Sequence, residues 1–220
     1  MIFALSYSLT ADSPLYPNTP RPEVRTLRSL DRGDSATTST ITFSTHAGTH
    51  VDVPRHFCPG GAGVQDLIPG PVSFFPAHCL DLHLAESREI GIPDLQAAIP
   101  QVRDAGALVV RTGWGTVRAG DPGRYTTDHP WISPDLPQFL RDACPRLRLF
   151  GLDQVSVSSP LHREAGHACH RSFLCGGRPV LLLEDLDLSD RRLAGPFRLH
   201  LFPCFTGALD GVPVTVIAER

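Results

Sequence analysis

The sequence predicts an α+β fold that is built around a substantial β core. Eight short β-rich runs recur along the chain, only two segments favour a helix, and the two kinds do not alternate as they do in a doubly wound sheet. Of the 220 residues, 41% are hydrophobic and 20% are charged, values that are typical of a globular protein. Glycine and proline are spread along the chain without a linker or a repeat. One domain over residues 1–220 is therefore expected.

Each predicted element has a local signal. The β-rich runs are bounded by turn residues and cover residues 2–8, 40–45, 72–82, 107–112, 147–152, 179–184, 197–202 and 212–218. A helix is predicted over residues 92–103, where Pro93 suits the first turn. A second helix is predicted to begin near Ser133, which would cap it ahead of Pro134 and Asp135.

Charge and composition exclude several classes of function. The formal net charge is -3 and no run of like charges occurs, which argues against a surface for nucleic acid or for membranes. No apolar stretch reaches the ~18 residues of a membrane span. Every basic residue is an arginine, so chemistry that needs a Schiff-base lysine or a P-loop lysine is excluded.

The cysteines and the first residues bear on the compartment. Six cysteines are scattered without a CxxC pair, a pattern that favours reduced thiols over disulfides. Cys58, within RHFC, is expected to be a small packing residue. The opening segment MIFALSYSL is apolar but lacks the basic start of a signal peptide. A cytoplasmic protein is therefore expected.

Three histidines and an aspartate fall within the twelve residues HAGTHVDVPRHF (46–57). The segment resists a helix, because Pro54 blocks continuation and its valines, threonine and glycine are poor helix formers. In an extended chain His50 and Asp52 share a face, and a flexible glycine lets His46 join them. Two imidazoles and a carboxylate suit zinc, or manganese with more oxygen ligands. The alternative is a polar turn whose imidazoles face water.

This segment resembles the HxGTHxDxPxHF signature of the metal-dependent cyclase family, which includes bacterial kynurenine formamidases and isatin hydrolases. Weaker likenesses extend over most of the chain: LYPNTP near the start, with Asn18 in place of a glycine, ALVVRTGWG (107–115), LFGLDQVSVSS (149–159), and HRSFL (170–174) followed by PVLLLEDL (179–186). The resemblance implies a swivelling β/β/α fold with a mixed, barrel-like β core and flanking helices. That fold agrees with the strand-rich prediction.

The resemblance also implies roles for individual residues. The metal ligands would be His46, His50, Asp52, His170 and Glu184, with Asp52 shared between two ions. His56 would be the catalytic acid or base. Glu184 has a physical argument of its own, because a carboxylate that ends the apolar run RPVLLLE is costly to bury without a cation. CGGRP lengthens the segment before Glu184, so His167 is an alternative to His170. The added residues are expected to form a hairpin bulge.

The implied activity is metal-dependent hydrolysis of a C–N amide bond. The first expectation is an arylformamidase that acts on N-formylkynurenine in tryptophan catabolism, with one or two Zn²⁺ per chain and Mn²⁺ as the alternative metal. Tyr16 and Phe57 are the predicted substrate contacts. Phe205 is a further aromatic candidate, and Arg25 could meet a carboxylate. An isatin hydrolase-like or other cyclic amide or ester hydrolase is one alternative. A non-catalytic metal- or ligand-binding barrel is another.

Two further expectations concern assembly and a group of serines. A homodimer or homotetramer is implied by the family, and the proline-rich segment 11–22 is expected to pack over a neighbouring subunit and help close the site. Apart from another copy of the chain, the expected partner is a small-molecule substrate. Ser156, Ser158 and Ser159 beside Asp153 hint at a serine hydrolase, but no GxSxG elbow is present, so turn chemistry is their expected role.

Overall fold

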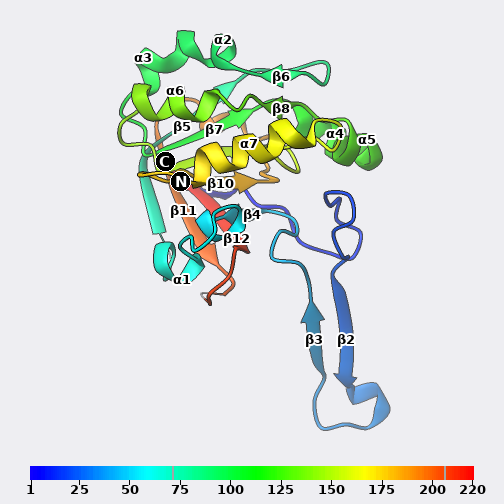
Figure 1. The fold of residues 1–220 in the computed structure, drawn as a ribbon. Helices are drawn as coiled ribbons and strands as arrows, with labels where there is room; N and C mark the ends of the chain where they lie inside the picture. Colours follow the sequence, from blue (N-terminus) through cyan, green and yellow to red (C-terminus); the bar gives the residue numbers. More distant parts are fainter. Residues whose placement is uncertain (71, 206) are drawn as a thin grey trace.

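The computed structural model describes residues 1–70, 72–205 and 207–220. Within these ranges, seven strands close into a mixed barrel in the order β12-β11-β5-β7-β9-β10-β4, and β4 pairs back onto β12 (Figure 1). The neighbours β5, β7, β9 and β10 are parallel, and the remaining pairs of the barrel are antiparallel. The predicted fold class, a mixed barrel-like core with flanking helices, is confirmed.

The bounds of the elements are as follows. The strands within the described ranges are β1 (Ile2–Ala4), β2 (Glu23–Arg28), β3 (Thr38–Thr42), β4 (His50–Asp52), β5 (Val72–Asp81), β6 (Glu89–Ile90), β7 (Ala107–Arg111), β8 (Trp131–Ile132), β9 (Leu149–Leu152), β10 (Leu181–Glu184), β11 (Phe197–Pro203) and β12 (Gly211–Glu219). The helices are α1 (Val64–Leu67), α2 (Ile92–Leu95), α3 (Ile99–Val102), α4 (Trp114–Gly120), α5 (Pro122–Thr127), α6 (Leu136–Ala143) and α7 (Arg163–Leu174). Among the described residues, no helix is long and apolar enough to cross a membrane.

Alternate residues of the parallel strands face two separate cores. In β10, Leu181 and Leu183 belong to the core inside the barrel, whereas Leu182 packs with residues of α6 and α7 outside it. β7 and β9 alternate in the same way, as expected for strands that are buried on both faces. Glu184 lies two residues after Leu182, so this period places its side chain on the outer face, beneath the helices.

The helix α7 lies along the outer face of the barrel beside β10 (Figure 1). Its buried positions are Gly166, Cys169, His170, Phe173 and Leu174. Successive positions are separated by three residues and then one, as are the residues on one face of a helix. A side chain at Gly166 would lie 1.8 Å from Ser158 Oγ and 2.9 Å from Ser158 Cα. The glycine therefore allows α7 to pack closely on the segment after β9. This close packing determines how near His170 lies to the barrel.

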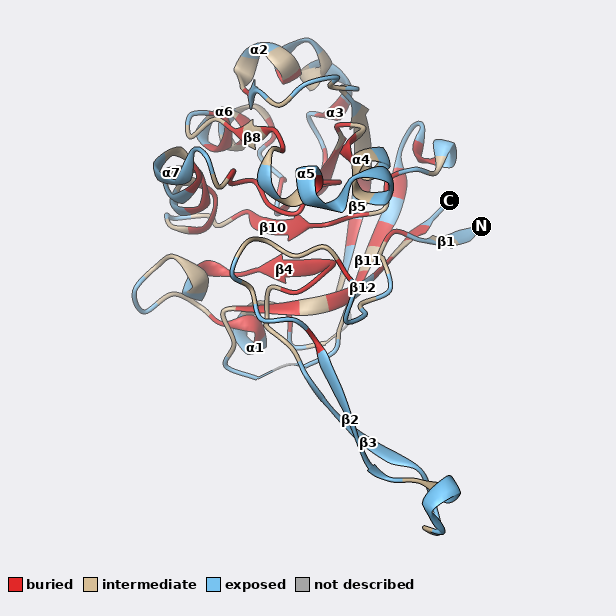
Figure 2. Cartoon of the chain, turned by 90° about the vertical axis from the view of Figure 1, so that its right-hand side faces the viewer, coloured by how far each residue is buried: buried red, intermediate tan, exposed pale blue. Residues whose placement is uncertain are grey.

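The strands β2 and β3 pair as a hairpin that projects far from the body, and we call residues 23–42 the arm (Figures 1 and 2). All residues of both strands are exposed. The exposed fraction of the residue is 65% for Val24, 52% for Leu27 and 63% for Ile41, and together they form an apolar surface on the arm. A two-stranded hairpin on its own is marginally stable in water.

Several local predictions need correction. The helix predicted over residues 92–103 is broken into α2, a 3₁₀ turn (Gln96–Ala98) and α3, because Pro100 lacks the N–H that a continuous helix needs. The second helix, α6, has Asp135 rather than Ser133 at its N-cap. The hairpin bulge expected at CGGRP is wrong, since residues 176–179 connect the end of α7 to β10. The helix α7 itself was not predicted.

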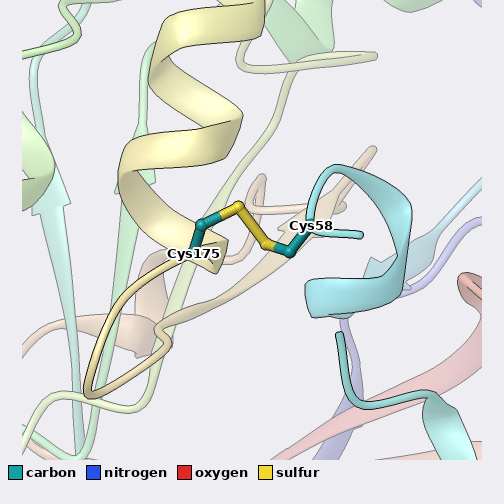
Figure 3. The surroundings of a disulfide bond; sticks show 2 residues. All are labelled: Cys58 and Cys175. Carbon is teal, nitrogen blue, oxygen red and sulfur yellow. A yellow bond between two sulfur atoms is a disulfide. The ribbon is translucent and has the colours of Figure 1, made fainter. Parts of the chain in front are cut away.

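The expectation of reduced thiols is wrong for one pair. Cys58 and Cys175 form a disulfide with a Cα–Cα distance of 5.6 Å (Figure 3). These cysteines are 117 residues apart and meet because the end of α7 packs against the turn after β4, which no local spacing could reveal. Cys58 is therefore a cross-link rather than a simple packing residue. Within the described part of the chain, the remaining cysteines are free.

Candidate metal centre and active site

The centre of the candidate site is built by two paired strands. In the antiparallel register of β4 and β10, His50 lies opposite Glu184 and Asp52 lies opposite Leu182. The exposed fractions of His50, Asp52 and Glu184 are only 3%, 1% and 3%. His50 Nε2 is 3.3 Å from Asp52 Oδ1 and 3.4 Å from Glu184 Oε2. One imidazole and two carboxylates thus share a buried spot on the outer face of the barrel.

Helix α7 adds a second imidazole to this spot. His170 Nε2 is 3.6 Å from Asp52 Oδ2 and 3.7 Å from Glu184 Oε1, and His170 is 4% exposed. His167, one turn earlier, is exposed and lies at the edge of the cavity, with its ring centroid 5.5 Å from that of Phe57. The fold therefore brings His170, and not His167, to the two carboxylates.

Backbone carbonyls orient both imidazoles. His50 Nδ1 lies 2.8 Å from the carbonyl oxygen of Gly48, and His170 Nδ1 lies 2.8 Å from that of Gly166. Each Nδ1–H donates to its carbonyl, which turns the Nε2 lone pair toward the carboxylates. Asp52 Oδ2 is buried without a hydrogen-bond partner among the described residues. Two lone pairs, two carboxylates and an orphaned buried oxygen fit a divalent cation.

A second set of possible ligands shares Asp52. His46 Nδ1 is 2.8 Å from Asp52 Oδ1, and its Nε2 is 2.9 Å from Asp210 Oδ2. The His56 ring stacks on His46 at a centroid distance of 4.0 Å, and His56 Nδ1 is 3.5 Å from Asp210. Ligand atoms of His46, Asp52 and His56 lie within 4.8 Å of one another, as do those of His50, Asp52 and Glu184. The geometry thus offers His56 as a ligand or as a proton carrier.

The pKa values of the histidines in the cluster are shifted in two directions. Burial disfavours a charged imidazole at His46, yet the carboxylates of Asp52 and Asp210 together outweigh it and raise the pKa to about 10. The pKa of His50 and that of His170 are also raised, because Asp52 and Glu184 outweigh burial. A bound cation would compete with these protons. At His56 the balance is opposite: burial lowers the pKa, and the nearby imidazoles of His46 and His170 add to the effect. Its ring is therefore neutral at pH 7 and can accept a proton.

A cavity of about 400 Å³ opens onto the cluster. Tyr16 and the loop that follows it line one side, and Phe57 lines another, so both predicted substrate contacts face this cavity. The loop belongs to the same chain as the cluster, so closure of the site by residues 16–20 needs no second copy. Phe205 does not line the cavity; it is 55% exposed and pairs with Phe43. Arg25 lies on the arm, so neither it nor Phe205 is a substrate contact within the single chain.

Two functional groups were missed from the sequence. Asp210 holds His46 and approaches His56; its only signal is an acidic residue in ALDGVPV just before a strand. A side chain at Gly211 would meet His46 Cε1 at 2.7 Å, so the ring packs directly on this glycine. Ser156 was expected to form a turn, but its hydroxyl donates to Glu184 Oε1 at 3.1 Å, and the N–H of Val157 donates to the same oxygen at 2.8 Å.

A larger cavity of about 710 Å³ lies elsewhere and contains none of the predicted site residues. Its two most buried cations are already paired: Arg111 with Asp81 at 2.8 Å, and Arg118 with Asp185 at N–O distances of 2.7 and 3.0 Å. Asp153 is likewise occupied, since it accepts hydrogen bonds from Thr112 and Gly113. The smaller cavity is therefore the candidate active site, because the ligand atoms of the cluster meet there with Asp52 Oδ2, which accepts no hydrogen bond from any described residue.

The fold and the metal-type cluster define a class of protein. The model of the Cyclase family matches residues 3–159, and the chain belongs to this family. A kynurenine formamidase of Geobacillus thermodenitrificans is 31% identical over 216 residues, which cover 98% of this chain and 96% of that protein. A kynurenine formamidase of Bacillus cereus is 30% identical over 189 residues, which cover 86% and 83% of the two chains.

Solved structures show the same fold at lower identity. Isatin hydrolase A from Labrenzia aggregata matches with a TM-score of 0.78 and 21% identity, over 99% of this chain and 93% of that one. A predicted metal-dependent hydrolase from Bacillus stearothermophilus matches with a TM-score of 0.72 and 21% identity, over 99% and 97% of the two chains. Together with the full-length relatives, these findings identify the chain as a hydrolase of the cyclase family.

Proposed function

We propose that this enzyme is an arylformamidase that hydrolyses N-formylkynurenine or a similar aryl formamide. The observation that carries the proposal is the 400 Å³ cavity, where the rings of Tyr16 and Phe57 face a buried set of two imidazoles and two carboxylates. An aryl ring suits the aromatic walls, and a formyl group is small enough to approach the cluster. The near-complete alignment with kynurenine formamidases supports this substrate class.

The chemistry follows from how the residues are held. His46, His50, Asp52, His170 and Glu184 would hold one or two Zn²⁺ ions, or Mn²⁺, with Asp52 shared. When bound, such an ion supplies polarisation of a carbonyl and a more acidic water. Neutral His56 at the rim can take a proton from the attacking water and return it to the leaving aryl amine. The C–N bond breaks, and formate and the free amine leave.

The proposed roles of the neighbours are orientation and exclusion of water. Ser156 and the N–H of Val157 bind one oxygen of Glu184 and leave the other free for the cluster. Phe57 stacks on His170 at 4.5 Å and shields it from solvent. A non-catalytic barrel would not need a neutral histidine beside the cluster, so His56 favours an enzyme. The isatin hydrolase-like alternative uses the same groups, and only substrate assays separate the two.

Turnover assays test the proposal. Protein purified without chelator should hold at least one zinc or manganese per chain, and should hydrolyse N-formylkynurenine with a higher kcat/KM than isatin. Chelator should abolish the rate and lower the melting temperature, because metal binds the folded state preferentially. Added Zn²⁺ or Mn²⁺ should restore both. Faster hydrolysis of isatin would replace arylformamidase by the alternative, and absence of metal after supplementation would remove the mechanism.

Assembly, location and domain organisation complete the proposal. The exposed apolar side chains of the arm support a homodimer or homotetramer in which each arm packs on another copy of the chain. Packing of segment 11–22 on that copy remains a prediction. We also propose that residues 1–220 act as one domain and that the enzyme works in the cytoplasm. The disulfide fits a reducing compartment only if it forms and opens reversibly.

A further inference from the structure

The Cys58–Cys175 disulfide lies directly behind the candidate site. Cys58 follows His56 and Phe57 in the turn after β4, and Cys175 is the first residue after α7, the helix that carries His170 (Figure 3). Residues 176–179 then lead into β10, which ends at Glu184. A single covalent bond thus joins the segments that bear the proton carrier and two of the candidate ligands.

The turn of residues 53–62 is held together by hydrogen bonds within it. The N–H of His56 donates to Val53 at 2.9 Å, that of Cys58 to Pro54 at 2.8 Å, and that of Gly61 to Cys58 at 2.8 Å. A side chain at Gly61 would lie 2.7 Å from the backbone of Pro54, so the two ends of the turn pack directly on each other. The position of the turn relative to α7 decides where the His56 ring lies, and a turn released from α7 opens its hydrogen bonds more often.

Noncovalent contacts also help to fix that position, because Phe57 and Cys58 pack against the outer core, which includes Phe173 and Leu174 of α7. Phe57 stacks on His170, with centroids 4.5 Å apart and planes at 22°, and meets the His56 ring edge-on at 4.6 Å. The His56 ring itself makes a stack on His46 and a 3.5 Å approach to Asp210, which is half exposed. The disulfide starts one residue after Phe57 and five residues after His170, so it adds a covalent link between the turn and the end of α7 close to that stack.

The bond is also within reach of small thiols. Cys58 and Cys175 are both partly exposed, and Gly176 and Gly177 beside them are exposed. Neither glycine would bring an added Cβ within 4 Å of another atom, so open space surrounds this loop.

We propose that the Cys58–Cys175 disulfide is a reversible positioning element, which holds the His56 turn on α7 when oxidised and releases it when a dithiol reduces it. In the exchange, one thiolate of the dithiol attacks the sulfur of one cysteine and expels the other cysteine as a thiolate. The second thiol of the dithiol then attacks the mixed disulfide and displaces the first cysteine. The S–S bond of the protein breaks, both cysteines take up protons, and the dithiol becomes a cyclic disulfide. The catalytic consequence rests on the proposed function; the release of the turn does not.

Hydrogen exchange tests the release without any substrate. Protein purified without reductant should contain the intact disulfide, seen as two cysteines protected from alkylation in mass spectrometry. After treatment with dithiothreitol, backbone exchange in residues 54–63 should accelerate at least about tenfold, while β7 should be unchanged. Six alkylated cysteines before reduction, or unchanged exchange in the turn after complete reduction, would overturn the proposal whether or not N-formylkynurenine is turned over.

A mutant cycle tests the effect on catalysis. Reduction should lower kcat at least about tenfold, because His56 moves away from the reacting groups. KM should rise by a smaller factor, because Phe57 moves with the turn while Tyr16 still contacts substrate. Cys58→Ser, Cys175→Ser and the double variant should all match the reduced wild type, because each of them lacks the same single disulfide bond. None of them should respond to dithiothreitol, whereas the control Cys204→Ser should respond like the wild type. Additive losses in the singles, or a reductant effect that persists in the double variant, would point to packing or to metal stripping instead.

Discussion

At the scale of single residues, the two Nδ1 hydrogen bonds to Gly48 and Gly166 turn a polar cluster into a candidate metal site. Because Nδ1 donates in these bonds, Nε2 is the nitrogen of each ring that can bind a metal. Both Nε2 atoms face the carboxylates of Asp52 and Glu184. The signature predicted which residue types would gather here, because an extended segment places His50 and Asp52 on one face. It could not predict Asp210, which reaches His46 from a distant part of the chain.

His50 and His56 should separate ligand from proton carrier. His50→Ala should lose metal and activity together, because it removes a buried nitrogen that points at the carboxylates. His56→Ala should retain most of the metal and lose about 10²- to 10⁴-fold in kcat, the range expected for a positioned acid or base. Elemental analysis with steady-state kinetics measures both. Equal metal loss in the two variants would make His56 a ligand.

Glu184 and His170 should bind metal, and His167 serves as the matched control. Glu184→Gln should weaken the metal affinity more than about tenfold, because the charge of a buried ligand is lost. His170→Ala should have a similar effect, whereas exposed His167→Ala should change the affinity by less than about twofold. Competition with a chromogenic chelator gives these constants. A strong loss in His167→Ala with none in His170→Ala would reverse the assignment.

At the scale of elements, α7 shows both what the sequence contains and what it conceals. The buried positions from Gly166 to Leu174 follow helical spacing, so the signal was present. Glycine, histidine, cysteine and serine within it are poor helix formers, so local propensity opposed the assignment. Burial against the outer face of the barrel outweighs that propensity. The strands were easier to predict, because apolar residues buried on both faces form continuous runs.

Gly166→Ala should displace α7 and, with it, His170. The added carbon would overlap Ser158, including its backbone, so the helix must shift outward. We expect a loss of about 1–3 kcal/mol in the free energy of unfolding, typical of overpacking, together with weaker metal binding. Gly120→Ala in α4 is the control, since an added Cβ there has no neighbour within 4 Å, and it should cost less than about 1 kcal/mol. Denaturant titration and chelator competition would measure the pair; equal effects would contradict the argument.

At the scale of the whole molecule, the sequence predicted the strands but not how they close. Pairing of β4 with both β10 and β12 closes the barrel and sets the three residues of β4 between strands from the far end of the chain. No local pattern encodes such a partner. The arm illustrates the same limit. Residues 40–45 were predicted to be a strand, but the sequence did not indicate that this strand belongs to a hairpin outside the body.

The arm should hold two copies together. Light scattering should give at least twice the chain mass of 23.9 kDa at micromolar concentration. A charge among the apolar side chains of the arm should separate the copies, so Leu27→Asp and Ile41→Asp should shift the mass toward the monomer. Leu161→Asp is the control, because Leu161 is 69% exposed and belongs to the segment before α7 rather than to the arm. A monomeric wild type would refute the assembly.

The arm also has a consequence for proteolysis. The chain contains no lysine, so trypsin can cut only after arginine, and Arg25, Arg28 and Arg32 all lie on the arm. In a lone chain these bonds are the natural first targets, because they stand clear of the folded body. When the arm is covered by a second copy, the same bonds become shielded. The rate of the first tryptic cut should therefore rise on dilution and follow the separation of the copies, with the body left intact as a large fragment.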